Sequence, residues 1–285
     1  MTRAADRPVW FITGCSTGFG RHLARHTLAL GYPTVVTARH PAQVADLVAG
    51  HAEQALVLAL DVTVPAQIEA AVAAAEARFG RIDVLVNNAG VGYFGSFEES
   101  DLAAVRAMFE INVWGLAQLT RAVLPGMRQR RSGTVVNFSS VGGVVAFPAL
   151  SFYNASKFAV EALSESLAQE VAPLGIKVLL VEPGPFRTDW AGRSAAAAPR
   201  TIPDYDQTAG ARTQMIRGYS GQQPGDPARA AAAIVQVVAS ARPPLRLVLG
   251  KMALTAVTAK LAAMQEDFDG WAAVSLGADY PAGEG

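Results

Sequence analysis

Short apolar segments alternate with amphipathic or alanine-rich segments along the chain up to Gly184. The short segments are apolar at nearly every position, which is typical of strands that helices cover on both faces. Alternation of such strands with helices indicates a parallel sheet with crossover helices. The predicted strands are 8–13, 33–38, 54–62, 81–90, 133–140, 175–184 and 245–250, and the predicted helices are 18–30, 65–78, 101–131, one that begins near 152, 226–240 and 252–265. The pattern predicts an α/β fold with a doubly wound parallel sheet of about seven strands, in three αβα layers, as a single domain over residues 1–285.

Two regions depart from this regular pattern. Residues 185–225 are rich in Ala, Gly, Arg and Thr, with only weak helical patterns at 190–198 and 210–219. A long, weakly patterned insertion inside a compact domain is usually either functional or disordered. Because ligands bind beyond the carboxyl ends of the strands in open α/β sheets, we expect this insertion to form a lid over the substrate. The tail at 268–285, with Gly, Ala and Pro, is expected to fray or to pack loosely.

Composition narrows the classes of function. Hydrophobic residues make up 51% of the 285 positions, but no run approaches the roughly twenty apolar residues that span a bilayer. The N-terminal residues resemble no signal peptide, so we expect a cytoplasmic protein without a membrane partner. The 24 Lys and Arg residues balance the 24 Asp and Glu residues, which disfavours nucleic-acid binding. The single cysteine and the four histidines lack the spacing of a metal site, so no metal is expected.

The sequence TGCSTGFG, residues 13–20, connects the first predicted strand to the first predicted helix. Gly14 permits a tight turn, Gly18 lets a ligand approach the backbone, and Gly20 lets the helix pack closely on the sheet. Free N–H groups at the N-terminus of a helix are suited to a pyrophosphate. In this strand-to-helix context, the spacing TGxxxGxG favours a dinucleotide-binding turn over a purely structural one.

The ends of the next strands suggest which dinucleotide binds. An acidic residue after the second strand would bind the 2′-hydroxyl of NAD, but Ala38 stands there and Arg39 follows. A guanidinium is suited to a 2′-phosphate, so we expect NADP(H) to be preferred, with NAD(H) possible. The alternative for Arg39 is a solvated surface side chain. Asp61 and Val62 are placed to contact adenine, and the amides of NNAG, residues 87–90, either fix the edge of the sheet or line the cofactor.

Tyr153 and Lys157 lie four residues apart at the start of a predicted amphipathic helix. Residues at this spacing are neighbours on a helix, although taken alone they would be a surface pair. Ser140 ends the fifth predicted strand, thirteen residues before Tyr153, and Asn112 lies in the long helix. Together with the TGxxxGxG turn and NNAG, these residues resemble the short-chain dehydrogenase/reductase superfamily, in its compact, single-domain branch with a Rossmann-type fold. The resemblance covers residues 8–250.

This constellation fits a hydride-transfer reaction at a carbonyl group, because such a reduction also needs a proton at the oxygen. Tyr153 is the candidate acid. To act as a base in reverse near neutral pH, it needs a pKa lowered by roughly two to three units, which the Lys157 cation would supply. Ser140 would donate a hydrogen bond to the substrate oxygen. The resemblance implies that Lys157 also binds the nicotinamide ribose and that Asn112 holds its helix open around a water that relays protons to Lys157.

The resemblance also implies a cofactor site that runs from the glycine-rich turn to the sequence VEPGPFRT, residues 181–188. Its candidate residues are Gly14, Ser16, Thr17, Gly18, Phe19, Gly20, Arg39, Asp61, Val62, Asn88, Ala89, Gly90, Tyr153, Lys157, Pro183, Gly184, Phe186 and Thr188. The candidate substrate-pocket residues are apolar or aromatic: Phe94, Val141, Phe147, Phe152 and Trp190. Since no Arg or Lys clamp for a carboxylate is evident, we expect a hydrophobic ketone or secondary alcohol as the small-molecule substrate.

Assembly and two rival functions complete the expectations. The family is usually dimeric or tetrameric through the helix that carries Tyr153 and the long helix before it, so the resemblance implies a homodimer or homotetramer. One rival function is epimerisation or dehydration on the same fold, although such relatives commonly carry a larger C-terminal substrate domain. The other is a nonenzymatic NADP-sensing protein, although such proteins typically lose the tyrosine or the lysine.

Overall fold

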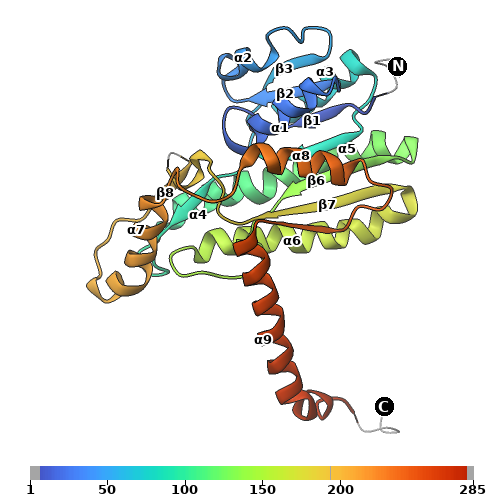
Figure 1. The fold of residues 1–285 in the computed structure, drawn as a ribbon. Helices are drawn as coiled ribbons and strands as arrows, with labels where there is room; N and C mark the ends of the chain where they lie inside the picture. The colour runs from blue at the N-terminus through green and yellow to red at the C-terminus, as the bar shows by residue number, and fades with distance from the viewer. Residues whose placement is uncertain (1–6, 193, 281–285) are drawn as a thin grey trace.

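A parallel sheet of seven strands forms the centre of the protein in the computed structural model, which describes residues 7–192 and 194–280 (Figure 1). The strand order is β3-β2-β1-β4-β6-β7-β9, so the chain starts in the middle, winds to one edge and then winds to the other. These strands are β1 Trp10–Ile12, β2 Thr34–Ala38, β3 Ala55–Ala59, β4 Val84–Asn87, β6 Gly133–Phe138, β7 Ile176–Pro183 and β9 Arg246–Leu249. The fold class predicted from the apolar runs is confirmed.

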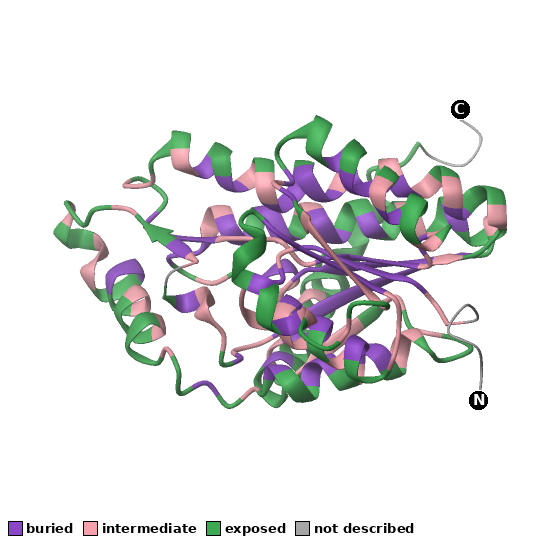
Figure 2. Cartoon of the chain, turned by 90° about the horizontal axis from the view of Figure 1, so that it is seen from above, coloured by how far each residue is buried: buried purple, intermediate pink, exposed green. Residues whose placement is uncertain are grey.

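Helices cover both faces of the sheet. Successive side chains along each strand point to opposite faces, so every strand packs against both layers of helices. Trp10 and Ile12 of β1 belong to one apolar cluster with α1, α2 and α8, whereas Phe11 belongs to another with α3, α5 and α6. Figure 2 shows the buried strands enclosed between the two helical layers. The helices are α1 Gly18–Ala29, α2 Ala45–Val48, α3 Pro65–Phe79, α4 Leu102–Phe109, α5 Leu116–Arg130, α6 Ser151–Val171, α7 Ala211–Gly218, α8 Pro227–Val238 and α9 Lys251–Leu276.

The long helix predicted at 101–131 is interrupted in its middle. Asp101 caps the start of α4, since its carboxylate accepts a hydrogen bond from the N–H of Ala103. The π-helical segment Glu110–Gly115 then separates α4 from α5. Such wide turns are rare and frequently mark functional sites, and this one carries Asn112.

The insertion at 185–225 differs from its predicted secondary structure. Helix α7 confirms the helical pattern at 210–219, but the pattern at 190–198 is wrong. There only the turn Asp189–Ala191 is helical, and β8 Ala195–Ala197 pairs in parallel with β5 Gly92–Phe94. Alanine favours helices, but the pairing with a strand far away in the sequence satisfies the backbone of this segment instead.

The C-terminal region also differs from the prediction. Helix α9 does not end near residue 265 but continues through Phe268 to Leu276, so this part of the predicted loose tail is helical. Helix α9 as a whole, residues 251–276, is rich in Ala, Leu and Met, and the single Gly270 does not outweigh their helix propensity. The helix projects away from the rest of the chain (Figure 1). Residues 281–285 of the predicted tail lie outside the described residues. Within the described ranges, no helix has both the length and the apolar character needed to cross a bilayer.

Candidate active site

A cavity of about 910 Å³ lies at the carboxyl ends of the central strands. Its walls come from the turn after β1, the segment after β4, the ends of β6 and β7, the start of α6 and the lid. This is where open α/β sheets bind ligands. The structure therefore brings together residues from the first, middle and last parts of the chain.

The glycine-rich turn has the conformation that its sequence predicts. Gly14 and Gly18 have φ values of 68° and 57°, a region that favours glycine. A Cβ on Gly20 would overlap the side-chain amide of Asn88, and a Cβ on Gly18 would lie 3.5 Å from Thr188. No side chain caps the N-terminus of α1, so its N–H groups are available to a ligand. The cradle of bare backbone fits the pyrophosphate of a dinucleotide.

The two asparagines of NNAG have different roles in the structure. Asn87 donates hydrogen bonds to Thr120 Oγ1 and Asn137 Oδ1, each at 2.9 Å, and so fixes neighbouring elements to the sheet. Asn88 lines the cavity and donates to the carbonyl of Thr13 at 2.7 Å. Asn87 therefore fixes the edge of the sheet, and a contact of Asn88 with the cofactor stays a prediction.

Asn112 links the π-helical segment to the loop after β4. Its Oδ1 accepts from the N–H of Val91, and its Nδ2 donates to the Val91 carbonyl, both at 2.9 Å. The Nδ2 group also lies 3.2 Å from Ser156 Oγ. A Cβ on Gly90 would lie 3.2 Å from Asn112 Oδ1 and 3.7 Å from Lys157 Nζ, so only the bare backbone of Gly90 stands between these two polar groups.

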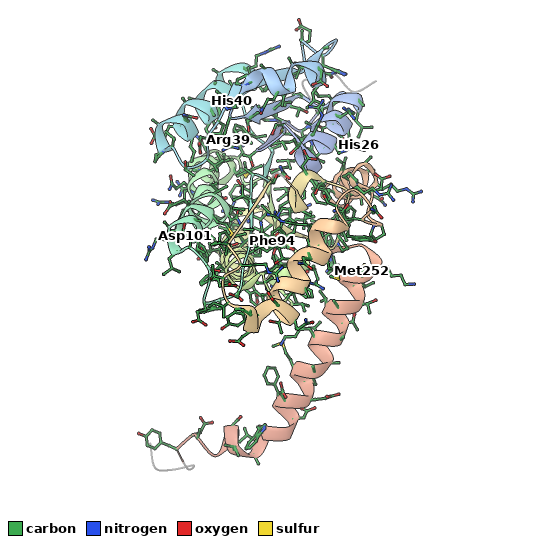
Figure 3. The ribbon with its side chains drawn as sticks, turned by 90° about the vertical axis from the view of Figure 1, so that its left-hand side faces the viewer. His26, Arg39, His40, Phe94, Asp101 and Met252 are labelled. Carbon is green, nitrogen blue, oxygen red and sulfur yellow. The ribbon has the colours of Figure 1, made fainter. Side chains whose placement is uncertain are left out.

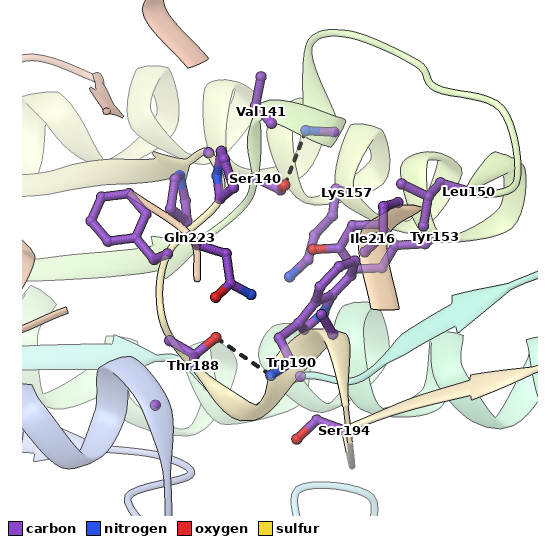
Figure 4. Close-up of a pocket in the computed structure, with 18 of the residues that line it drawn as sticks. Ser140, Val141, Leu150, Tyr153, Lys157, Thr188, Trp190, Ser194, Ile216 and Gln223 are labelled. Atoms are coloured by element: carbon purple, nitrogen blue, oxygen red, sulfur yellow. Dashed lines mark hydrogen bonds between the residues drawn. The ribbon is translucent and has the colours of Figure 1, made fainter. Parts of the chain in front are cut away.

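Ser140, Tyr153 and Lys157 converge on the cavity (Figure 4). Ser140 follows the end of β6, and its Oγ accepts from the N–H of Gly142 at 3.0 Å. Tyr153 lies in the first turn of α6, with its ring 4.9 Å from that of Trp190. Lys157, one turn later, is 6% exposed, and its Nζ donates to the carbonyl of Phe138 at 2.8 Å. The apparent surface pair of the sequence is thus a buried pair.

Burial sets the pKa values of this pair. It raises the pKa of Tyr153 to about 12, against the opposing effect of a hydrogen bond with Ser140. It lowers the pKa of Lys157 to about 8, although the charge of Glu161 acts in the other direction. The lowered pKa that the reverse reaction needs stays a prediction, since burial in the chain acts in the opposite direction. The Lys157 Nζ stands 5.9 Å from the centre of the tyrosine ring.

A pair of buried carboxyl groups lies behind Lys157, and sequence reasoning missed it. Glu161 is one turn further along α6, and Glu182 is a fully buried residue of β7. Arg246 of β9 reaches both, at 3.2 Å and 3.5 Å. Burial and then the neighbouring Glu161 raise the pKa of Glu182 to about 7. Because both acids sit in segments that read as an ordinary helix and strand, no local signal in the sequence marks them.

The predicted adenosine end lies outside the cavity. Arg39 is exposed just after β2 (Figure 3). Asp61 accepts two hydrogen bonds from Thr63, one from the backbone N–H of Thr63 and one from its hydroxyl. Val62 is buried against Gly115. Of the predicted cofactor residues, Ser16, Gly20, Arg39, Asp61, Val62 and Ala89 do not line the cavity, whereas the other twelve do.

The apolar half of the cavity needs two corrections. Val141, Phe147 and Trp190 line it as predicted. Phe94 does not, because it is buried behind Trp190, edge-on at 5.4 Å. Phe152 does not either, because it points to the other side of α6 and stacks on Phe97 at 4.9 Å.

The insertion at 185–225 contributes cavity residues that sequence reasoning missed. They include Arg212, Ile216 and Gln223, and α9 adds Met252. The guanidinium of Arg212 lies 5.1 Å over the ring of Phe147, so the cavity wall includes a cation that the sequence analysis did not identify. A weakly patterned insertion gives no signal for which of its side chains turn inward, since its tertiary structure decides this.

Comparison with known proteins gives concordant results. The short chain dehydrogenase family matches residues 8–198. Oxidoreductase BOA17 of Botryotinia fuckeliana is 38% identical over 269 residues, which cover 94% of this chain and 98% of that protein. The 3-ketodihydrosphingosine reductase of Bacteroides thetaiotaomicron is 36% identical, with 85% of this chain and 87% of that protein covered.

Solved structures of the same family have the same fold as this chain. A short-chain dehydrogenase from Streptomyces avermitilis is 46% identical, with a TM-score of 0.90, over 96% of this chain and all of that one. A Burkholderia phymatum enzyme in complex with NAD is 26% identical, with a TM-score of 0.78, over 90% of this chain and 94% of that one. ElxO with NADP bound is 25% identical, with a TM-score of 0.72, over 87% of this chain and 99% of that one. This chain belongs to the short-chain dehydrogenase/reductase family of oxidoreductases.

Proposed function

We propose that this protein reduces a hydrophobic ketone with NADPH, or oxidises the corresponding secondary alcohol with NADP, with Tyr153 as the acid or base. The observation that carries the proposal is the convergence of Ser140, Tyr153 and Lys157 on one cavity below the phosphate-binding turn. The bound nicotinamide supplies or accepts the hydride. The residues of the chain bind and orient the substrate oxygen and move its proton.

The raised pKa of Tyr153 supports the reductive direction. A phenol with a pKa of about 12 keeps its proton at neutral pH and is ready to donate it to a developing alkoxide. The Ser140 hydroxyl, which lies beside it, is suited to donate a hydrogen bond to the same oxygen. Lys157 holds a cation close to the phenol, which helps the phenolate that remains after proton transfer. Asn112 is proposed to support a proton relay to Lys157 across the bare backbone of Gly90.

The preference for NADP rests on Arg39. Family members hold either NAD or NADP, as the two neighbouring complexes illustrate. Here the second strand ends in Ala38 instead of an acid, and the exposed Arg39 follows it, with a guanidinium that is suited to a 2′-phosphate. The measurement is kcat/KM with NADPH and NADH for the wild type and Arg39→Ala. We expect the variant to lose about tenfold with NADPH and little with NADH, and equal losses with both would refute this role.

The substrate class rests on the cavity wall. Val141, Phe147, Leu150, Trp190 and Ile216 make the half around Tyr153 mainly apolar. The relative named 3-ketodihydrosphingosine reductase supports a ketone with a hydrophobic body. A sensor or an epimerase is less favoured, because the chain keeps Ser140, Tyr153 and Lys157 and matches named oxidoreductases over most of its length.

A carbonyl panel tests the proposal directly. NADPH oxidation is followed with long-chain, aromatic and small charged carbonyl compounds, using the wild type and Tyr153→Phe. We expect turnover of hydrophobic ketones by the wild type alone. Turnover of small charged oxoacids only would overturn the substrate class, and NADPH binding without turnover of any carbonyl would favour a sensor.

We propose a cytoplasmic homodimer or homotetramer in which α5 and α6 meet their copies. Phe158 and Leu163 of α6 are 43% and 42% exposed, which supports an interface on this face. Light scattering of the purified protein measures the assembly, and a monomer would refute it.

A further inference from the structure

Helix α9 leaves the body of the protein after about two turns. Its first turn is anchored, since a Cβ on Gly184 would lie 3.1 Å from the Cβ of Ala253, and Val257 is buried as well. Beyond Val257, Met264 alone among residues 258–276 is even partly covered. Figures 1 and 3 show this part as a rod that no other element of the described chain touches. A rise of about 1.5 Å per residue makes it roughly 28 Å long.

Apolar side chains follow one another along this rod at alternating steps of three and four residues. The residues of this apolar seam are Leu254, Val257, Leu261, Met264, Phe268 and Trp271. Such spacing corresponds to positions a and d of a heptad repeat, the pattern of helices that pair along their length. Leu261, Phe268 and Trp271 are 57%, 60% and 68% exposed. Large apolar side chains gathered on one exposed stripe indicate a contact that a single copy does not make.

Two charges beside the seam select a partner and a direction. Lys260 precedes Leu261, and Asp267 precedes Phe268, so both flank the seam on the same side. In an antiparallel pair with Leu261 against the partner's Met264, each Lys260 lies across from the partner's Asp267. A parallel pair in register would place Lys260 beside the partner's Gln265 instead. The charges therefore complement a second copy of the same helix in the antiparallel direction.

The rod is less suited to a membrane surface. It carries one lysine, Lys260, against three acids, Glu266, Asp267 and Asp269. Helices that lie on membranes are typically rich in basic residues on the polar face, because anionic lipids attract them.

We propose that α9 is an assembly element, which pairs with α9 of a second copy in an antiparallel, two-fold symmetric contact along the apolar seam. A specific interface covers at least about 1,200 Å² in total, or about 600 Å² from each copy. A covered Phe or Trp buries roughly 150–250 Å², so the exposed 60% of Phe268 and 68% of Trp271 together supply roughly a third to a half of this area. The contact is separate from the α5 and α6 face.

The pairing also reaches the rim of the cavity. Met252, Ala253 and Ala256 at the base of α9 line the cavity. In the antiparallel register, the partner's Trp271 lies beside Leu254, two residues from Met252. A partner helix therefore braces the base of α9, which forms one wall of the site.

Sedimentation velocity of the full chain over a range of concentrations tests the proposal. Phe268→Asp should halve the mass of the assembly, because it places a charge in the seam. Lys260→Asp and Asp267→Lys should each raise the dissociation constant about tenfold, because each makes two like-charge contacts, and the double variant should restore it. Glu266→Lys, next to Asp267 but on the outer side of the helix, makes the same change of charge and is the matched control, with an expected change below twofold.

Each of the other outcomes overturns the proposal. A wild type that is monomeric at all concentrations, or a Phe268→Asp variant of unchanged mass, would show that α9 does not hold two copies together. Charge reversals without effect, or without rescue in the double variant, would refute the antiparallel register. A monomeric protein that sediments with phosphatidylcholine and phosphatidylserine vesicles, and loses this binding in Phe268→Asp, would make α9 a membrane element instead.

Discussion

Helices α6 and α9 depart from the usual distribution of side chains in opposite directions. Along α6 the buried residues include Tyr153, Asn154, Ser156, Lys157, Glu161 and Ser164, all polar. Along α9 the exposed residues include Leu261, Phe268 and Trp271, all apolar. Burial of charge and exposure of apolar surface both cost free energy, so each departure marks a place where something other than the folding of one copy determines the residues.

The cost in α6 is concentrated in its charged groups. Ser156 and Ser164 donate to carbonyls of their own helix at 2.7 Å, so their burial is compensated. Lys157 has a single hydrogen bond, and both carboxyl oxygens of Glu182 lack one. The residues proposed to do the chemistry, and the acids behind them, are thus the ones that the fold accommodates least well.

The largest effect is expected from removing the proton donor. Tyr153→Phe keeps the ring against Trp190 but loses the hydroxyl, so kcat should fall by about 10²–10⁴, the usual contribution of a positioned acid. Steady-state NADPH oxidation with a responsive ketone measures this. Tyr32→Phe, remote from the cavity, is the control and should keep full activity. A Tyr153→Phe variant with wild-type turnover would refute the mechanism.

A smaller effect is expected at Lys157, where a substitution should raise the stability of the protein. Its pKa is about 8 when folded and about 10.5 when unfolded, so the unfolded chain binds more protons between these values. The burial cost is full below pH 8 and disappears as the pH rises toward 10.5. Lys157→Met removes about 3 kcal/mol of this cost and loses a hydrogen bond worth about 1 kcal/mol. The net gain in free energy of unfolding should be about 2 kcal/mol at pH 7.

Urea unfolding of the cofactor-free proteins at pH 7 and pH 10 measures this gain. Lys177→Met changes an exposed lysine of β7 and should shift neither value by more than about 0.5 kcal/mol. A Lys157→Met variant that is less stable than the wild type at pH 7 would contradict the buried-cation argument. A gain that persists unchanged at pH 10 would do the same.

These predictions depend on features that the sequence reveals unequally. The sheet, the glycine-rich turn and the pair at 153 and 157 are local patterns, and a single sequence shows them. The pKa of Tyr153 is different, because it depends on how deeply the fold buries the ring. Glu161 and Glu182 lie on different elements and meet only through the packing of α6 on β7. Phe94 and Phe152 are aromatic in the right segments, but which way each side chain points is decided by the tertiary structure.

A still smaller gain in stability is expected at Glu182. Its folded pKa of about 7 lies above the unfolded value of about 4.5, so its contribution to stability is complete below pH 4.5 and is lost as the pH rises through 7. Glu182→Gln removes about 3 kcal/mol of this cost at pH 8, but it buries an amide without a hydrogen-bond partner, which costs about 2 kcal/mol. The variant should therefore be more stable by about 1 kcal/mol at pH 8 and should gain nothing at pH 4.5. Thermal unfolding at both pH values measures this. Glu170→Gln, on an exposed side chain of α6, is the control, and an equal gain at both pH values would contradict the assignment.

The smallest effect is expected on the apolar seam of α9, and its dependence on concentration makes it informative. Leu180→Ala in the core should lower the free energy of unfolding by about 2–5 kcal/mol at any concentration. Leu261→Ala, on a side chain that is 57% exposed, should lower it by less than about 0.5 kcal/mol in dilute, dissociated protein. When the copies are paired, the same leucine is covered and its loss should cost more, because association stabilises the folded state by mass action. If Leu261→Ala lowers the free energy of unfolding equally at micromolar and at hundredfold higher protein concentration, α9 does not pair with a second copy. In that case the exposed side of the comparison with α6 would need another explanation.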